Sequence, residues 1–195
     1  MIETVTKKYK ALNEIAEQNG ILIFGGTEDR EIPLCEIKQA FALNSNLYNR
    51  SVANLSVTDA SEVYAACASE LNPKTVMLHI GITDIKLFEE NIQQFEQKYR
   101  ELIEKIREKN NKCHIAIVSF KNPDETSGIT ALNKQLEYIA QSEQCEYCDI
   151  SAKRIWNPKQ TKDVVSFVYS MGFVQPLKNK RPIYDLAKML FCCEA

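Results

Sequence analysis

Apolar residues recur along the chain with two different spacings. Short, almost continuous apolar runs at residues 21–24 (ILIF), 75–81 (TVMLHIG) and 114–120 (HIAIVSF) are typical of strands that a parallel sheet buries on both faces. Shorter runs within 47–55 (LYNRSVANL) and 145–150 (CEYCDI) predict two more strands. The pattern therefore predicts about five strands.

Between these runs, apolar residues return every three or four positions, as they do on one face of a helix. The longest such stripe predicts one continuous helix over residues 87–110, with charged residues on its other faces. The predicted helices cover residues 4–18, 34–43, 56–72, 87–110, 128–144 and 183–193.

Strands that alternate with helices indicate right-handed crossovers and a parallel sheet covered on both faces. We therefore expect a three-layer α/β/α fold of flavodoxin-like type, forming one domain over residues 1–195. The extra N-terminal helix, within residues 1–19, is expected either to pack across the sheet or to form a dimer contact, because either would bury its apolar stripe.

Composition narrows the classes of function. Hydrophobic residues make up 45% of the chain and the net charge is −2, so no basic surface is expected for a nucleic acid. The first twenty residues lack the apolar core of a signal peptide, and no apolar run approaches the length of a membrane span. We expect a cytoplasmic protein without nucleic-acid or membrane partners.

Ligands of such sheets bind outside the carboxyl ends of the strands. The loops that follow the first four strands are GGTED, VANLS, GITD and KNPDETSG. Their residues should therefore meet at one edge of the sheet, which is where we expect the functional site.

These loops, in this order, resemble the conserved blocks of the SGNH or GDSL hydrolases. That family has a Gly-Asp-Ser turn after strand one, a Gly after strand two, a Gly-x-Asn-Asp after strand three and a late Asp-x-x-His. The resemblance runs over residues 21–192 and implies the family's α/β fold and an ester or carbohydrate-ester substrate.

The resemblance also assigns positions in this chain. Gly26 stands where the family has aspartate, Thr27 where it has the serine nucleophile, and Asn54 where it has the oxyanion-hole glycine. In the third block, Gly81 and Asp84 match the family and Thr83 replaces the oxyanion-hole asparagine. In the last block, Met171 and Val174 occupy the places of the catalytic Asp and His.

These replacements bear on catalysis, because a neutral hydroxyl needs an adjacent base in order to attack an ester. The chain has two histidines, His79 within strand three and His114 at the start of strand four, and neither lies in the last block. We interpret both as structural residues. The favoured hypothesis is a catalytically degenerate hydrolase-like protein that binds a small ester, an acylated sugar or a protein partner at its loops. The alternative is an active esterase in which Thr27 uses His79 or a nearby acidic residue as its base.

Thr27 also has a purely structural interpretation. Threonine is a favoured helix N-cap, and Glu28 and Asp29 suit the positive end of a helix dipole. Asp84 similarly either caps the segment after strand three or, together with Asp59, faces the site. The sequence favours a capping role for Thr27.

Seven cysteines without a signal peptide indicate reduced thiols that serve mainly as small buried residues. Cys145 and Cys148 form a C-x-x-C pair, which the adjacent Cys192 and Cys193 could complete as a zinc site. This thiol-based metal or redox module is a third hypothesis. We expect no cofactor and no metal.

Overall fold

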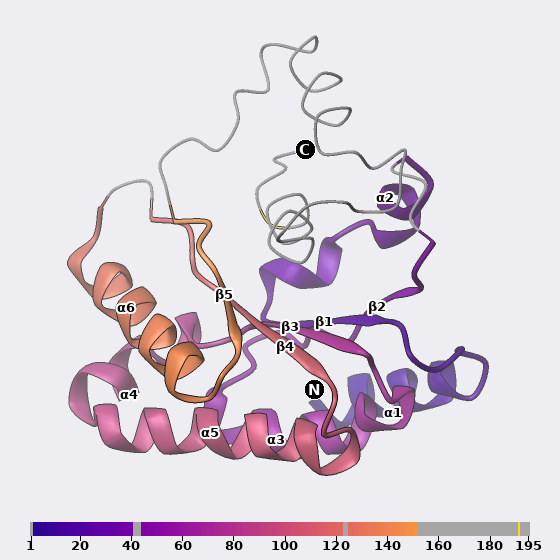
Figure 1. Ribbon diagram of the computed structural model, residues 1–195, viewed down its shortest axis with the longest axis horizontal. Coiled ribbons are helices and arrows are strands. Elements are labelled where there is room, and N and C mark those ends of the chain that lie inside the picture. The colour runs from indigo at the N-terminus through magenta and orange to yellow at the C-terminus, as the bar shows by residue number, and fades with distance from the viewer. Residues whose placement is uncertain (1, 41–43, 123–124, 152–190, 192–195) are drawn as a thin grey trace, which may run out of the picture.

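A computed structural model describes residues 2–40, 44–122, 125–151 and 191. Its centre is a parallel sheet of five strands in the order β2-β1-β3-β4-β5 (Figure 1). The strands are β1 (Ile21–Gly25), β2 (Leu47–Asn49), β3 (Thr75–His79), β4 (His114–Val118) and β5 (Glu146–Cys148). The predicted number and direction of the strands are confirmed.

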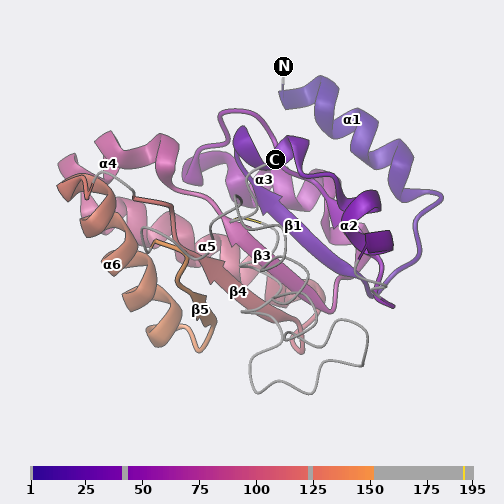
Figure 2. The ribbon, with the colours of Figure 1, turned by 90° about the horizontal axis from the view of Figure 1, so that it is seen from above.

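Helices cover both faces of this sheet, as the apolar runs in the strands predict. On one face lie α3 (Val57–Cys67) and α5 (Ile92–Lys109), and on the other lies α2 (Leu34–Ala40) (Figure 1). Helix α6 (Ser127–Ser142) packs beside β4 and β5, at the opposite edge of the sheet from α2 and β2 (Figure 2). The fold is the expected three-layer α/β/α arrangement.

Alternate residues of each strand point to opposite faces, and both sets are buried. Leu22, Leu78 and Ile117 join the core formed with α3, α5 and α6. Ile23 and Met77 face the other way and are also fully buried. This double burial explains why the strands read as continuous apolar runs.

The first helix, α1 (Ile2–Asn13), is shorter than the periodicity predicted, and Ile15 beyond its end is exposed. It packs against α3, where the Tyr9 hydroxyl donates to the Ser51 carbonyl at 2.7 Å and Asn13 Nδ2 donates to the Cys67 carbonyl at 2.9 Å. Asn13 also accepts two hydrogen bonds from the buried Arg50 guanidinium, which lies over the Tyr9 ring. The helix therefore lies on the helical layer and contacts the loop after β2.

The predicted helix over residues 87–110 is in fact two helices. The chain breaks at Asn91 (φ −152°, ψ 79°), between α4 (Ile85–Glu90) and α5. The Asn91 side chain accepts a hydrogen bond from the Gln94 amide at 3.1 Å, as an N-cap does. A cap residue at the right place therefore interrupts an otherwise continuous apolar stripe.

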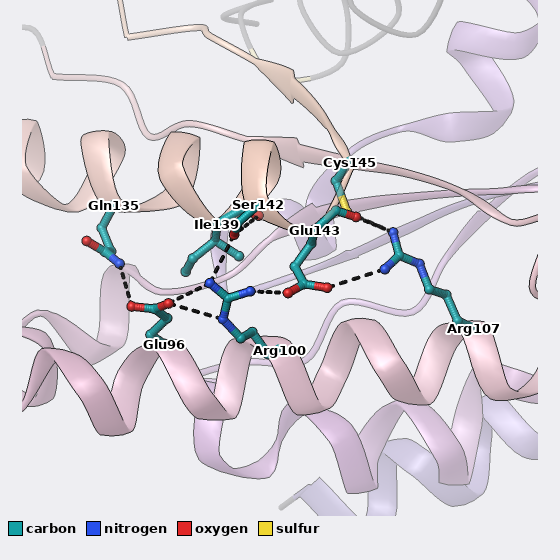
Figure 3. Close-up of polar contacts among 8 residues, drawn as sticks. All are labelled: Glu96, Arg100, Arg107, Gln135, Ile139, Ser142, Glu143 and Cys145. Atoms are coloured by element: carbon teal, nitrogen blue, oxygen red, sulfur yellow. Dashed lines mark hydrogen bonds and ion pairs between the residues drawn. The ribbon is translucent and has the colours of Figure 1, made fainter.

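Charged side chains join α5 to the end of α6 (Figure 3). Glu143 pairs with Arg100 and, at 3.4 Å, with Arg107, and Arg100 also pairs with Glu96. The Arg107 guanidinium lies 3.6 Å from Cys145 Sγ. These contacts hold the turn before β5 against the helical layer, on the side of the molecule away from the predicted site.

The closing helix predicted at residues 183–193 lies outside the described residues except for Phe191, which is helical. Among the described helices, none combines the length and apolarity needed to cross a bilayer.

Candidate functional site

The loops after β1 and β2 meet at the carboxyl edge of the sheet, as expected. Thr27 Oγ1 accepts a hydrogen bond from the Asn54 amide at 3.0 Å and donates one to Asn54 Oδ1 at 3.2 Å. The two residues that the resemblance placed at the nucleophile and oxyanion positions are therefore in direct contact.

The prediction that Thr27 is a helix cap is wrong. The residue precedes a single 3-10 turn, η1 (Glu28–Glu31), and has helical dihedrals (φ −60°, ψ −46°) where a cap residue is normally extended. Its side chain makes no capping hydrogen bond. The hydroxyl instead contacts Asn54 in the loop after β2.

Asn54 has φ +54°, in the left-handed region that favours glycine and tolerates asparagine. This backbone requirement explains how asparagine can stand where the family pattern has glycine. The conformation of the loop is compatible with either residue.

The third block departs further from an oxyanion hole. Gly81 has φ +130°, which only glycine adopts readily, and the Thr83 hydroxyl donates to the Leu55 carbonyl at 2.8 Å. Thr83 therefore holds the loop after β2, and among the described residues the Thr27 side chain bonds to Asn54 and not to Thr83.

Asp84 does not cap the segment after β3, which corrects one of the two roles expected for it. Its carboxylate is buried and accepts hydrogen bonds from Ser56 Oγ at 2.5 Å and from the Val57 amide at 2.9 Å. Ser56 in turn caps α3 through the Thr58 amide. Asp84 therefore fixes the start of α3, whereas Asp59 in the same helical turn is exposed.

A buried aspartate and histidine form the most unusual pair at this edge. Asp29 Oδ1 lies 2.8 Å from His79 Nδ1, and Asp29 Oδ2 accepts the Gly26 amide at 2.8 Å. The side chains of Asp29 and His79 are 5% and 8% exposed, respectively. The expectation that Asp29 serves a helix dipole is incorrect, because the carboxylate turns back toward the sheet.

The register of the sheet explains this pair. Gly25 of β1 lies directly beside His79 of β3, and a Cβ on residue 25 would be 2.0 Å from Asp29 Oδ2. The Asp29 carboxylate occupies the space that a side chain would fill there, and from that space it reaches the histidine of the neighbouring strand.

His79 is only half satisfied, contrary to its interpretation as a satisfied structural residue. Its Nε2 is buried and has no hydrogen-bond partner among the residues that the structure describes. The ring stacks on Phe120 (centroids 4.4 Å apart, 28° between planes) and meets Phe191 at 4.7 Å. His114 lies at the start of β4, at the amino ends of the strands, and pairs there with Glu146 at 2.8 Å.

His79 lines a cavity of about 440 Å³. Its described wall combines apolar and polar residues. The apolar ones lie directly after η1, in the loops after β3, β4 and β5, in helix α6 and at the helical residue 191. They are Ile32, Ile82, Phe120, Ile129, Ile150 and Phe191.

Four polar residues complete the described wall of this cavity. Asp29 and His79 form its buried polar part, and Glu28 and Lys121 are exposed at its rim. A cavity that combines apolar side chains with a few convergent polar groups is the usual form of a small-molecule site.

The described cysteines provide little support for metal or redox chemistry. Among the residues that the structure describes, no group of three or more potential ligands surrounds a common point. Burial raises the pKa of Cys145 to about 11 and that of Cys113 to about 12, which disfavours the reactive thiolate. Cys148 lies in β5, as predicted. Cys192 and Cys193 lie outside the described residues, as do Met171 and Val174.

Sequence reasoning missed the pairing of Asp29 with His79. The residues are 50 positions apart and follow no spacing rule. The sequence contained two signals, namely a histidine inside an otherwise apolar strand and two glycines before an acidic turn. Neither signal indicates that the histidine and the aspartate pair.

Solved structures share this fold. A Streptococcus pneumoniae protein described as a platelet activating factor is 17% identical, with a TM-score of 0.66 over 88% of this chain and 90% of that one. A GDSL-like lipase from Bacteroides thetaiotaomicron is 15% identical (TM-score 0.56; 87% and 97% covered). The acetyl xylan esterase AlAXEase is also 15% identical (TM-score 0.57; 82% and 86% covered).

The chain therefore has the fold of the SGNH or GDSL hydrolases. No family model and no curated protein sequence matches it.

Proposed function

We propose that this protein binds a small ligand in the cavity beside His79 and does not hydrolyse esters through Thr27. The observation that carries the proposal is the pairing of Thr27 with Asn54. The Thr27 hydroxyl donates a hydrogen bond to Asn54 Oδ1. This amide oxygen is too weak a base to remove the proton and so activate the hydroxyl.

The histidines of the chain support the same conclusion. There are two in the whole sequence, so no histidine can come from the segment that carries Val174. His114 lies at the amino ends of the strands, and the described hydrogen bonds of the Thr27 side chain go to Asn54 and not to His79. A serine-type triad loses roughly a million-fold in turnover when its members are removed.

The shape and lining of the cavity support a small ligand with an apolar body. The fold is shared with a lipase and an acetyl xylan esterase, which makes an ester-like or acylated molecule a reasonable class to screen first. Binding at this edge agrees with the general position of ligands in open parallel sheets.

Ester hydrolysis through Thr27 is the second candidate. It is favoured by one observation, namely that the unpartnered His79 Nε2 lies at the same edge of the sheet as Thr27. In that case His79 would act as the general base, with Asp29 orienting its ring.

One assay separates the two candidates. Hydrolysis of p-nitrophenyl acetate and butyrate is measured between pH 6 and pH 9 for wild type, Thr27→Ala and Thr27→Ser. We expect no rate above background that depends on residue 27. Turnover that disappears in Thr27→Ala and survives in Thr27→Ser would contradict the proposal and establish the second candidate.

Binding is tested by thermal shift with short-chain esters, acylated sugars and their alcohols. A ligand that raises the melting temperature of wild type, and that loses affinity when Ile129 is changed to Trp to fill the cavity, supports the proposal. A screen without any stabilising ligand would count against it.

A further inference from the structure

The wall of the cavity contains a buried polar atom that can still form a hydrogen bond. Within the described part of the chain, His79 Nε2 has no hydrogen-bond partner, and leaving a buried polar atom unpaired is unfavourable. A group that supplies the missing hydrogen bond is therefore favoured at this atom, in addition to any gain from filling the apolar space.

The neighbours of Asp29 determine the form of hydrogen bond that His79 can make. Asp29 Oδ2 accepts a hydrogen bond from the Gly26 amide, and Asp29 Oδ1 lies 2.8 Å from His79 Nδ1. An ionised carboxylate can only accept, which places a ring proton on Nδ1. In the uncharged form of the ring, His79 Nε2 then keeps its lone pair and is an acceptor.

The surroundings of the ring limit what can approach it. Phe120 stacks on the imidazole and Phe191 lies against it at 4.7 Å, while Ile82, Ile129 and Ile150 complete the apolar wall. Burial against these rings costs a fully charged partner more hydration free energy than it costs a neutral donor on an apolar body.

We propose that Asp29 and His79 form a recognition site for the hydroxyl or amide N–H of a neutral ligand, with His79 Nε2 accepting the hydrogen bond and the cavity enclosing the apolar body. Asp29 is a positioning residue, because it selects the ring tautomer. This inference rests on the proposed function and names the class of ligand for the same cavity.

A matched pair of small probes tests the proposal. The alcohol 1-phenylethanol and the ketone acetophenone have nearly the same size and shape, but only the alcohol has a proton to donate. We expect wild type to bind the alcohol about three- to tenfold more tightly, which corresponds to one hydrogen bond. Equal affinities, or a preference for the ketone, would overturn the proposal.

Asp29→Asn supplies a sharper test. The Gly26 amide still needs an acceptor, so the Asn oxygen faces Gly26 and the Asn NH₂ faces His79 Nδ1. The ring proton then moves to Nε2, which becomes a donor. We expect the preference for the alcohol to disappear, since both probes carry an oxygen that can accept. A preference unchanged in this variant would contradict the role given to Asp29.

Imidazole nitrogen NMR of the wild-type protein provides a readout that does not depend on a variant. The chain has two histidines, and His114, at the amino ends of the strands, serves as the internal control. The alcohol should shift the Nε2 resonance of His79 and leave His114 unchanged, while the ketone should have a smaller effect. Failure of both probes to perturb His79 at concentrations up to tens of millimolar would overturn the proposal.

The tests also separate this inference from the proposed function. Ester turnover that depends on Thr27 would refute the proposed function, yet the alcohol preference at His79 would still be measured. Conversely, a stabilising ligand whose binding leaves the His79 resonances unchanged would support a binding protein and refute this site.

Discussion

Gly25 and Asp29 share one small volume at the carboxyl edge of the sheet. A methyl group on residue 25 would lie 2.0 Å from Asp29 Oδ2, which is far inside van der Waals contact. Because Gly25 is paired with His79 across the sheet, this close approach also brings the carboxylate to the histidine. The absence of a side chain at residue 25 therefore makes the Asp29–His79 contact possible.

Gly25→Ala should displace the Asp29 carboxylate. We expect the free energy of unfolding in urea to fall by about 1–3 kcal/mol, the usual cost of overpacking a buried site. The His79 nitrogen resonances should shift as its partner is lost.

Gly26→Ala is the matched control for this change. A Cβ there would meet no atom within 4 Å, and the residue does not have a positive φ. Its unfolding free energy should change by less than about 0.5 kcal/mol. Equal losses in the two variants would show that the turn, and not the Asp29 contact, requires glycine.

The left-handed conformation of Asn54 leads to a second prediction. Asn54→Gly and Asn54→Ala both remove the oxygen that accepts from Thr27, but only glycine adopts φ +54° without strain. The alanine variant should therefore be about 1 kcal/mol less stable than the glycine variant in urea unfolding. Equal stabilities would mean that the loop changes its conformation when the side chain is removed.

Asp84 should be important for stability because it holds the start of α3. In Asp84→Ala the buried Val57 amide loses its acceptor, and we expect a loss of about 1–3 kcal/mol in the free energy of unfolding. Asp59→Ala, in the exposed part of the same helical turn, should cost at most about 1 kcal/mol. A smaller effect at Asp84 than at Asp59 would contradict the anchoring role.

Buried thiols should make the protein less stable in alkali. Burial raises the pKa of Cys113 from its ordinary value of 9.0 to about 12 and those of Cys67 and Cys145 to about 11. Above pH 9 the unfolded thiols lose their protons while the folded ones keep them, so stability falls as the pH rises from about 9 toward 12. Burial also raises the pKa of Tyr64, Tyr99 and Tyr147, which adds to the fall.

Urea unfolding between pH 8 and pH 11 measures this effect. Cys113→Ala should make the decline shallower by up to about 1.4 kcal/mol per pH unit, which corresponds to one proton. Cys35→Ala removes an exposed thiol and controls for the loss of a sulfur atom. A decline that is equally steep in both variants would show that Cys113 does not contribute to it.

Local periodicity was sufficient to predict the layers of this fold. Apolar runs such as 21–24 and 114–120 mark strands because burial on both faces leaves few polar positions, and this signal needs no knowledge of distant residues. The same reasoning failed at Asn91, where a capping side chain interrupts a stripe that periodicity alone would continue.

The site could be predicted only as a location. Parallel strands bring their following loops to one edge, so the sequence indicated that residues near Thr27 and Asn54 would meet there. The partner of each polar group could not be read in the same way. Thr27 is a good cap by residue type, yet its hydroxyl makes no capping hydrogen bond and pairs instead with Asn54 of the loop after β2.

The order of the helices and strands, their layers and the edge that carries the site therefore follow from the sequence, because each depends on the spacing of apolar residues within one segment. The contact between Asp29 and His79, the unpartnered Nε2 and the cavity around it do not. They depend on the register that sets Gly25 beside His79, and that register exists only once segments 50 residues apart have packed together.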